Sequence, residues 1–88
     1  MPTLSMFYGI VIRMFNEEGA QHKQPHFHAN YASYDAIFNL DGEIMAGSLP
    51  SKQRKLVVAW AALHRDELQA NWDMLSCGEN PYKIDALK

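Results

Sequence analysis

Apolar and polar residues alternate along the first part of the chain. From Leu4 to Met14 every second residue is apolar, and the apolar face so formed carries Leu4, Met6, Tyr8, Ile10, Ile12 and Met14. A period of two is that of an extended strand with one face against a core. The pattern predicts one strand over residues 3–15, followed by a loop in the polar run of residues 16–21.

Two more alternating runs lie on either side of Ala32-Ser33. The first begins near Pro25, which is tolerated as the first residue of a strand, and the second covers residues 34–40. Their core faces carry Phe27, Ala29 and Tyr31 on one strand and Tyr34, Ala36, Phe38 and Leu40 on the other. Counting outward from a tight turn at Ala32-Ser33 predicts three cross-strand pairs: Asn30 with Asp35, His28 with Ile37, and His26 with Asn39.

The second half of the chain changes period. Asp41-Gly42 predicts a hairpin turn into a short fourth strand, residues 43–46. Apolar residues then recur at steps of three and four, in a stripe made of Leu56, Val57, Trp60, Leu63, His64, Leu68, Trp72 and Leu75. This spacing predicts an amphipathic helix from about Ser51 to Cys77, with Ser48 or Ser51 as N-cap and Gly78 as its stop. One such helix would be about 40 Å long, so two shorter helices that meet near His64 would suit a small sheet better.

The predicted elements define an α+β fold. It consists of a four-stranded antiparallel meander sheet with one long C-terminal amphipathic helix, or two consecutive ones, packed on one face. Residues 1–88 are expected to form a single domain, with residues 79–88 as a polar C-terminal tail that contains the apolar pair Tyr82 and Ile84.

Composition narrows the classes of function. The net charge of −2 gives no general attraction to nucleic acids or acidic membranes. The longest apolar run, residues 8–12, is too short to span a bilayer, and the N-terminus lacks the features of a signal peptide. The lone Cys77 fits a reducing compartment. We therefore expect a cytoplasmic protein without a membrane segment; an oligomer is compatible with the sequence.

Three of the four histidines fall within seven residues: His22, His26 and His28. In a strand, His26 and His28 point to one face, opposite the core, and Asp35 lies diagonal to His28, within reach of a hydrogen bond that would fix its tautomer. Two imidazoles on one face can act as general base and general acid in phosphodiester cleavage. His26, His28 and Asp35 are therefore the candidate catalytic residues of a metal-independent, ribonuclease-like activity.

Such cleavage also needs a cation beside the phosphate. Lys52, Arg54 and Lys55 begin the predicted helix, where the helix dipole makes basic residues locally unfavourable and a bound anion favourable. They are the candidate phosphate-binding residues. The simpler alternative is ordinary solubility, with charge balance from Asp41 or Glu43.

The histidines admit two further interpretations. His22, His26 and His28 together offer three nitrogen ligands, the number that a catalytic zinc site uses while keeping one position open. The acid/base interpretation needs no cofactor, whereas this one needs zinc. In the third interpretation the histidines simply face solvent or a protein partner. His64, on the helix stripe, is expected to be half-buried and hydrogen-bonded within the fold rather than a ligand.

Several segments of the chain resemble domain-of-unknown-function family 4160. Pro25-His26-Phe27-His28-Ala29 is the most specific; the others are Ser5-Met6-Phe7-Tyr8-Gly9-Ile10, Tyr34-Asp35-Ala36, Gly47-Ser48-Leu49-Pro50, Trp60-Ala61-Ala62-Leu63-His64-Arg65, Glu67-Leu68 and Asn71-Trp72. The chain departs from the family pattern in its longer loop, residues 16–21, and in Gln24, which replaces the first proline of a Pro-Pro-His sequence. That departure weakens the transfer of a role to His22.

The resemblance implies a small prokaryotic protein, often encoded beside a second small protein in an arrangement that resembles toxin–antitoxin modules. It places functional weight on His26 and His28, and next on His22 and His64, but implies no established reaction. The leading hypothesis is therefore one component of a toxin–antitoxin-like pair, which binds a cognate small protein and acts on RNA through the histidine pair. The alternatives are the zinc-binding module and a non-catalytic interaction domain.

Overall fold

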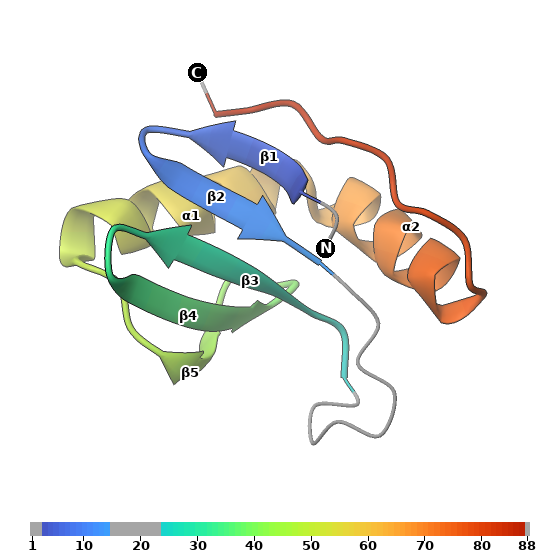
Figure 1. Cartoon of the computed structure of the whole chain (residues 1–88), viewed down its shortest axis with the longest axis horizontal. Coiled ribbons are helices and arrows are strands. Elements are labelled where there is room, and N and C mark those ends of the chain that lie inside the picture. Colours follow the sequence, from blue (N-terminus) through green and yellow to red (C-terminus); the bar gives the residue numbers. More distant parts are fainter. Residues whose placement is uncertain (1–2, 15–23, 88) are drawn as a thin grey trace.

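The described chain forms one antiparallel sheet with two helices behind it. The computed structural model describes residues 3–14 and 24–87. Its strands are β1 (Thr3–Phe7), β2 (Ile10–Arg13), β3 (His26–Tyr31), β4 (Tyr34–Asn39) and β5 (Ile44–Gly47), and they lie side by side in sequence order (Figure 1). The helices are α1 (Ser51–Leu63) and α2 (Arg65–Ser76). The predicted α+β class and meander order are confirmed, but the sheet has five strands where four were expected.

The extra strand comes from a turn inside the first alternating run. Tyr8 and Gly9 both have positive φ, 48° and 78°, and Phe7 pairs with Ile10 across them. A two-residue turn with positive φ at both positions matches the twist of the flanking strands. The single strand expected over residues 3–15 is thus a hairpin. Alternation did not reveal the turn because the period of two continues through both arms.

The hairpin also changes which residues of the first arm face the core. The register shifts by one residue between Thr3 and Ser5, and such a shift reverses the face of every residue that follows. Phe7 is therefore buried, whereas Met6 and Tyr8, which the alternation placed in the core, are 66% and 60% exposed. In β2 the prediction holds, because Ile10, Ile12 and Met14 are all buried.

The second hairpin follows the prediction closely. The expected pairs Asn30–Asp35, His28–Ile37 and His26–Asn39 are the observed ones. Asn39 then organises the next turn, because its side-chain oxygen accepts hydrogen bonds from the backbone N–H groups of Asp41 and Glu43. The expected fourth strand, residues 43–46, is β5, displaced by one residue.

Aromatic rings fill the space between the sheet and α1. Trp60 of α1 is fully buried, and its ring centroid lies 5.7 Å from that of Phe27 and 5.5 Å from that of Phe7. Phe27 in turn stacks on its cross-strand partner Phe38. Such pairs add to the stability that burial of their apolar area provides. One face of the sheet is therefore committed to the core.

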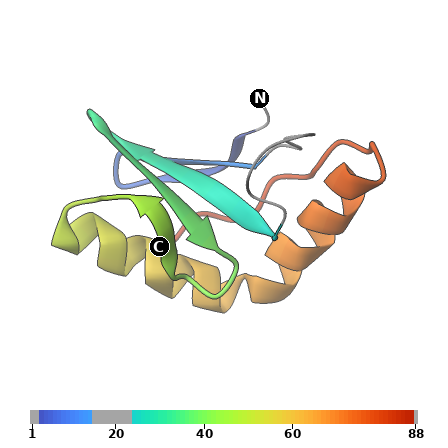
Figure 2. The ribbon, with the colours of Figure 1, turned by 90° about the horizontal axis from the view of Figure 1, so that it is seen from below.

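The predicted long helix is broken at His64, as expected from the alternative of two shorter helices that meet there. His64 has φ −118° and ψ 26°, outside the helical region, and it ends α1 and begins α2. The break turns α2 up past the end of the sheet where β3 begins (Figure 2). It also turns Leu63 away from the core, so this member of the predicted apolar stripe is 70% exposed.

The N-terminus of α1 differs from the prediction, whereas the C-terminus of α2 agrees with it. The N-cap of α1 is Pro50, with no side-chain hydrogen bond, so neither Ser48 nor Ser51 caps it. At the other end Gly78 stops α2 as expected. The Glu79 N–H donates to the Met74 carbonyl and the Gly78 N–H to that of Leu75, with Gly78 at φ 78°. This is the Schellman arrangement, which favours glycine.

The tail beyond Gly78 is part of the packed structure. It runs back beside β1 (Figure 1), where the Ile84 N–H donates to the Leu4 carbonyl over 2.8 Å. Ile84 is buried, and the Trp60 indole N–H donates to the Asp85 carbonyl over 2.8 Å. The polar composition of residues 79–88 concealed this docking, because the contacts use mainly backbone groups.

Candidate functional site

His26 and His28 lie on β3 and face away from Phe27, as the alternation predicts. Their ring centroids are 5.3 Å apart in an edge-to-face arrangement. Because Phe27, which lies between them, packs on Trp60 of α1, the face that they share is the one opposite α1. We call this surface the open face of the sheet. The two rings nevertheless have different surroundings.

His26 is enclosed rather than exposed. Only 1% of its surface is accessible, and its ring lies 5.1 Å from that of Trp72, on the part of α2 that rises beside the sheet. Its Nδ1 is 3.0 Å from the Gln24 carbonyl oxygen. A carbonyl oxygen can only accept a hydrogen bond. A neutral His26 therefore carries its hydrogen on Nδ1, as the donor to Gln24, and an electron pair on Nε2. The expectation that both histidines share an exposed surface is therefore wrong for His26, because α2 covers it.

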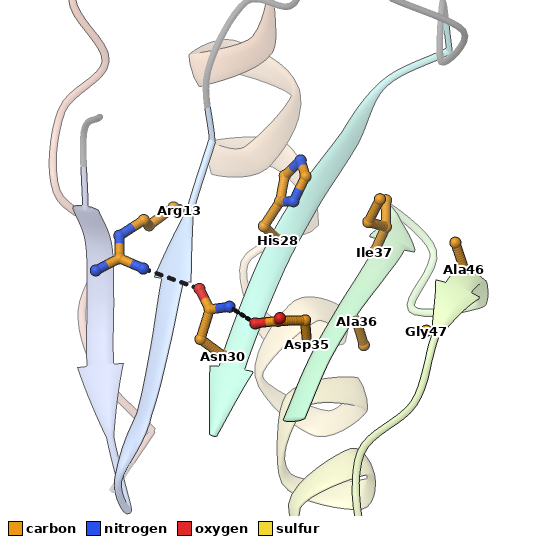
Figure 3. Close-up of a pocket in the computed structure, with 8 residues that line it drawn as sticks. All are labelled: Arg13, His28, Asn30, Asp35, Ala36, Ile37, Ala46 and Gly47. Carbon is orange, nitrogen blue, oxygen red and sulfur yellow. Dashed lines mark hydrogen bonds between the residues drawn. The ribbon is translucent and has the colours of Figure 1, made fainter. Parts of the chain in front are cut away.

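His28 lines a depression in the open face. Arg13 of β2 and Ile37 of β4 are its cross-strand neighbours. We call this depression of about 370 Å³ the open-face hollow; it is lined by Arg13, His28, Asn30, Asp35, Ala36, Ile37, Ala46 and Gly47 (Figure 3). Aliphatic side chains form one side of it and charged or amide side chains the other.

A chain of hydrogen bonds crosses the polar side of the hollow. The Arg13 Nη1 donates to the Asn30 Oδ1 over 2.9 Å, and the Asn30 amide donates to the Asp35 carboxylate (Figure 3). The Asp35 carboxylate thus accepts its hydrogen bond from Asn30, and the expected orienting contact with His28 stays a prediction. Asn30 instead connects a cation to an anion and holds both at the rim.

The three basic residues at the start of α1 lie elsewhere. Lys52, Arg54 and Lys55 are exposed, and none of them lines the open-face hollow. Figures 1 and 2 place the start of α1 at the end of the sheet that carries the β3–β4 turn, whereas β3 begins with His26 at the opposite end. The structure therefore does not bring the predicted phosphate contacts to the histidine pair. The cation nearest in register to His28 is Arg13.

The zinc interpretation depends on a residue that lies outside the described part of the chain. His22 falls in the undescribed segment, so only His26 and His28 can be placed. Within residues 3–14 and 24–87, no three histidine, cysteine or acidic side chains are grouped as metal ligands. The ring centroids of the two placed histidines are 5.3 Å apart.

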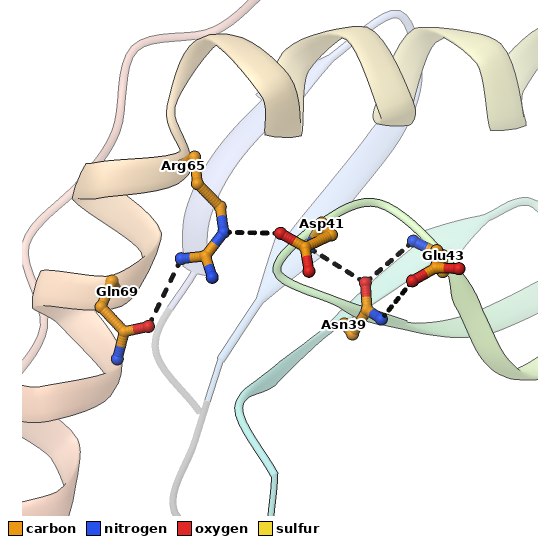
Figure 4. A network of polar contacts seen from close by, with 5 residues as sticks. All are labelled: Asn39, Asp41, Glu43, Arg65 and Gln69. Carbon is orange, nitrogen blue, oxygen red and sulfur yellow. Dashed lines mark hydrogen bonds and ion pairs between the residues drawn. The ribbon is translucent and has the colours of Figure 1, made fainter.

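The fourth histidine holds the helix junction together. The Nδ1 of His64 is 2.7 Å from a carboxylate oxygen of Glu67, and its ring lies 5.6 Å from that of Trp60. Next to it, Arg65 donates to Asp41 over 3.0 Å and to Gln69 over 3.3 Å, which ties the β4–β5 turn to α2 (Figure 4). His64 is thus hydrogen-bonded within the fold, as expected.

Two residues of the hollow escaped the sequence reasoning. Arg13 and Asn30 both lie on the polar face of their strands, which alternation alone identifies. Their relation to His28, however, depends on the pairing of β2 with β3. The connection between those strands is a segment of more than two residues, so no turn rule fixes its register. Trp72 was assigned to the core, and its contact with His26 follows only from the bend at His64.

Comparison with known proteins identifies a family without assigning an activity. A family model described as "Domain of unknown function (DUF4160)" matches residues 9–73, which is most of the chain. No curated protein and no solved structure matches the chain. Within the described residues, no helix has both the length and the apolar character needed to cross a bilayer. The matched range begins just before β2 and ends within α2, and it contains every residue of the open-face hollow.

Proposed function

Because the chain belongs to the DUF4160 family, whose function is unknown, we propose a role from the open face: the protein is one component of a toxin–antitoxin-like pair, and this face binds a small cognate protein. The observation that carries the proposal is the composition of the open-face hollow. Ile37 and Ala46 provide an apolar centre, and Arg13, Asn30 and Asp35 provide a polar rim. An apolar centre with a polar rim is the usual anatomy of a protein–protein contact.

Charge favours a protein over a nucleic acid as the first occupant. Asp35 stands at the rim and is connected to Arg13 through Asn30, so the cation is already partly balanced. Lys52, Arg54 and Lys55 lie away from the hollow and would not contact the same phosphate chain. A partner that offers an acidic group to Arg13 and a hydrogen-bond donor to Asp35 would match this rim.

The test measures affinity for the small protein encoded beside this one, by isothermal titration calorimetry. Ile37→Asp places a charge in the apolar centre and should weaken binding at least tenfold. Arg13→Ala should weaken it less and reduce its dependence on salt. The matched control is Lys55→Ala, an exposed change on the other side of the molecule, which should leave affinity unchanged. Equal affinity for all three variants would remove the open face as the binding surface.

A second candidate function is cleavage of RNA by the histidine pair. It is supported by the 5.3 Å separation of the rings and by Arg13, which supplies a cation opposite His28 in place of the α1 residues. In this scheme His28 exchanges a proton with the substrate. His26, enclosed and held by Gln24, positions His28 through its ring contact or exchanges a proton with it.

The cleavage hypothesis is tested by expressing variants and measuring growth inhibition and RNA integrity. His28→Asn removes the titrating group while keeping a polar side chain of similar reach, and should abolish both effects. His26→Asn should reduce them partly. If the combined His26→Ala, His28→Ala variant inhibits growth as strongly as the unchanged protein, the acid/base mechanism is wrong. Unchanged partner affinity in His28→Asn would separate catalysis from binding.

The zinc alternative, with His22, His26 and His28 as ligands, needs its own measurement. Elemental analysis of protein purified without an affinity tag should give about one zinc per chain if the three histidines form a site. His22→Ala should then lower the metal content. A stoichiometry near zero would leave the histidine pair as a metal-independent feature.

A further inference from the structure

The C-terminal segment occupies a groove that recognises the backbone of an extended chain. Three groups form the groove: the Asn71 side chain, the Trp60 indole and the outer edge of β1. Asn71 is fully buried, and its amide makes two hydrogen bonds to one residue, accepting from the Tyr82 N–H over 3.0 Å and donating to the Tyr82 carbonyl over 2.9 Å. We call this surface the tail groove.

The contacts of the tail groove continue along the segment. Two residues after Tyr82, the Ile84 N–H donates to the Leu4 carbonyl of β1. The next carbonyl, that of Asp85, accepts from Trp60. Ile84 contributes the buried side chain, whereas Lys83 and Asp85 are exposed. Alternate side chains pointing in and out, with backbone groups bonded between them, describe the binding of an extended peptide at a sheet edge.

The seam between the tail and β1 is incompletely filled. A cavity of about 320 Å³ lies there, lined by Thr3, Leu4, Ser5 and Met6 on one side and by residues 83–86 on the other. Among the described residues, one backbone hydrogen bond, from the Ile84 N–H to the Leu4 carbonyl, joins the tail to β1. The tail therefore lies against the edge without forming a regular strand pair with it.

The connection between α2 and the tail has the features of a hinge. Gly78, with φ 78°, ends α2, and Glu79 and Asn80 are exposed. Pro81 follows and cannot donate a backbone hydrogen bond. Only a few residues therefore separate the end of the helix from Tyr82, which is already bound to Asn71. Short connections of this kind favour exchange of the segment between copies.

We propose that the tail groove also accepts residues 82–87 of a second copy of this chain, so that two copies exchange their tails and form a closed dimer. The tail is the segment that the structure shows to fit this groove, and every copy carries both the segment and the groove. Exchange preserves each contact that residues 82–87 make with the groove, and only the path of residues 78–81 changes. Reciprocal exchange is self-complementary and gives a twofold assembly.

Concentration decides between the two arrangements. A short linker holds the tail at an effective concentration on the order of 1 mM beside its own groove. The unchanged protein should therefore be monomeric at micromolar concentration, and a dimer should appear as the concentration approaches that value. This assembly does not depend on the open face or on the partner proposed for it.

The decisive variant shortens the hinge. Without Glu79 and Asn80, the tail no longer reaches its own groove but still reaches that of another copy. We expect this variant to sediment as a dimer at micromolar concentration, with slow amide exchange at Ile84. Inserting four glycine and serine residues after Asn80 is the matched control and should give a monomer at the same micromolar concentration. Monomeric behaviour of the shortened variant, with fast exchange at Ile84, would overturn the proposal.

A second measurement covers the case in which the shortened variant does not fold. The unchanged protein is examined near 1 mM, the effective concentration of the tail, as a mixture of two isotopically labelled pools. Nuclear Overhauser contacts between Leu4 of one pool and Ile84 of the other are expected. Adding Asn71→Ala should abolish both the contacts and the dimer. A monomer throughout this range, or a dimer in which Leu4 and Ile84 contact each other only within one chain, would exclude tail exchange.

Discussion

Asn71 forms hydrogen bonds to both the N–H and the carbonyl of Tyr82, which lies eleven positions further along the chain. A carboxamide has one acceptor oxygen and two donor hydrogens. The Asn71 side chain uses its oxygen and one of its hydrogens to bind a single residue. The arrangement makes one side chain of α2 responsible for the start of the tail. It also explains why a polar residue is fully buried in so small a protein.

The first prediction concerns this contact. Asn71→Ala removes both hydrogen bonds and should lower the free energy of unfolding by about 2–3 kcal/mol, since the remaining Tyr82 groups lose their partners. Urea denaturation measures the loss, and amide exchange at Ile84 should accelerate at the same time. Asp66→Asn, on the exposed side of α2, is the control and should change stability little. A neutral Asn71→Ala would mean that the tail is held by Ile84 and Trp60 alone.

The second prediction compares two glycines with nearly equal backbone angles. Gly47 and Gly78 have φ of 75° and 78°, so alanine at either position costs about 1–2 kcal/mol in backbone strain. An added Cβ at Gly47 would lie 2.2 Å from the Asp35 carbonyl oxygen, whereas one at Gly78 would have no atom within 4 Å. Gly47→Ala should therefore destabilise the protein more than Gly78→Ala.

The two glycine variants should also differ in binding. Gly47 lines the open-face hollow, and moving Asp35 to relieve the clash would distort its rim. We expect Gly47→Ala to weaken partner binding even at a temperature where the variant is folded, and Gly78→Ala to leave it intact. Thermal denaturation and calorimetric titration measure the two effects. Equal stability losses would show that β5 moves away at little cost.

The third prediction uses the turn between β1 and β2. Tyr8 adopts φ 48°, which asparagine tolerates better than tyrosine, and its side chain is mostly exposed. Tyr8→Asn should therefore stabilise the protein by about 0.5–1 kcal/mol and raise Tm by a few degrees. Tyr8→Phe keeps the unfavourable φ and should have almost no effect. A lower Tm for Tyr8→Asn would reveal a stabilising contact of the tyrosine ring.

The fourth prediction tests the break between the helices. Leu63 and Leu68 both belong to the predicted apolar stripe, but Leu63 is exposed and Leu68 is fully buried. Leu68→Ala should cost about 2–5 kcal/mol, as large-to-small changes in a core do, and Leu63→Ala should cost less than about 0.5 kcal/mol. Chemical denaturation of both variants decides. Similar losses would indicate that the helix runs straight through His64 in solution.

The sequence predicts the central part of the fold well because its turn fixes the register. A two-residue turn at Ala32-Ser33 leaves one way to pair β3 with β4, and all three expected pairs are observed. The Tyr8-Gly9 turn was missed because Tyr8 is an unusual residue at positive φ, and the alternation continues across it. The bulge near Ser5 could not be predicted either, because a shift of one residue in the pairing leaves no mark on the sequence of the strand.

The candidate site was predicted only in part. The sequence identifies the two histidines and the face on which they lie, because strand geometry determines both. It does not show that Trp72 covers His26, which depends on the angle between α1 and α2. Nor does it place Arg13 opposite His28, which depends on pairing across a long connection. The contacts that complete the site join elements that are distant in sequence, and the sequence alone does not determine them.

The covered edge of β1 also bears on how the protein behaves in a crowded solution. An unprotected edge strand can pair with the edge of another molecule and start aggregation. Here the tail blocks β1, while β5 at the other edge is only four residues long and is bent by an irregularity beside Phe38. Loss of the tail would leave the edge of β1 open. Truncated or proteolysed chains should therefore precipitate more readily than intact ones, whatever happens to their activity.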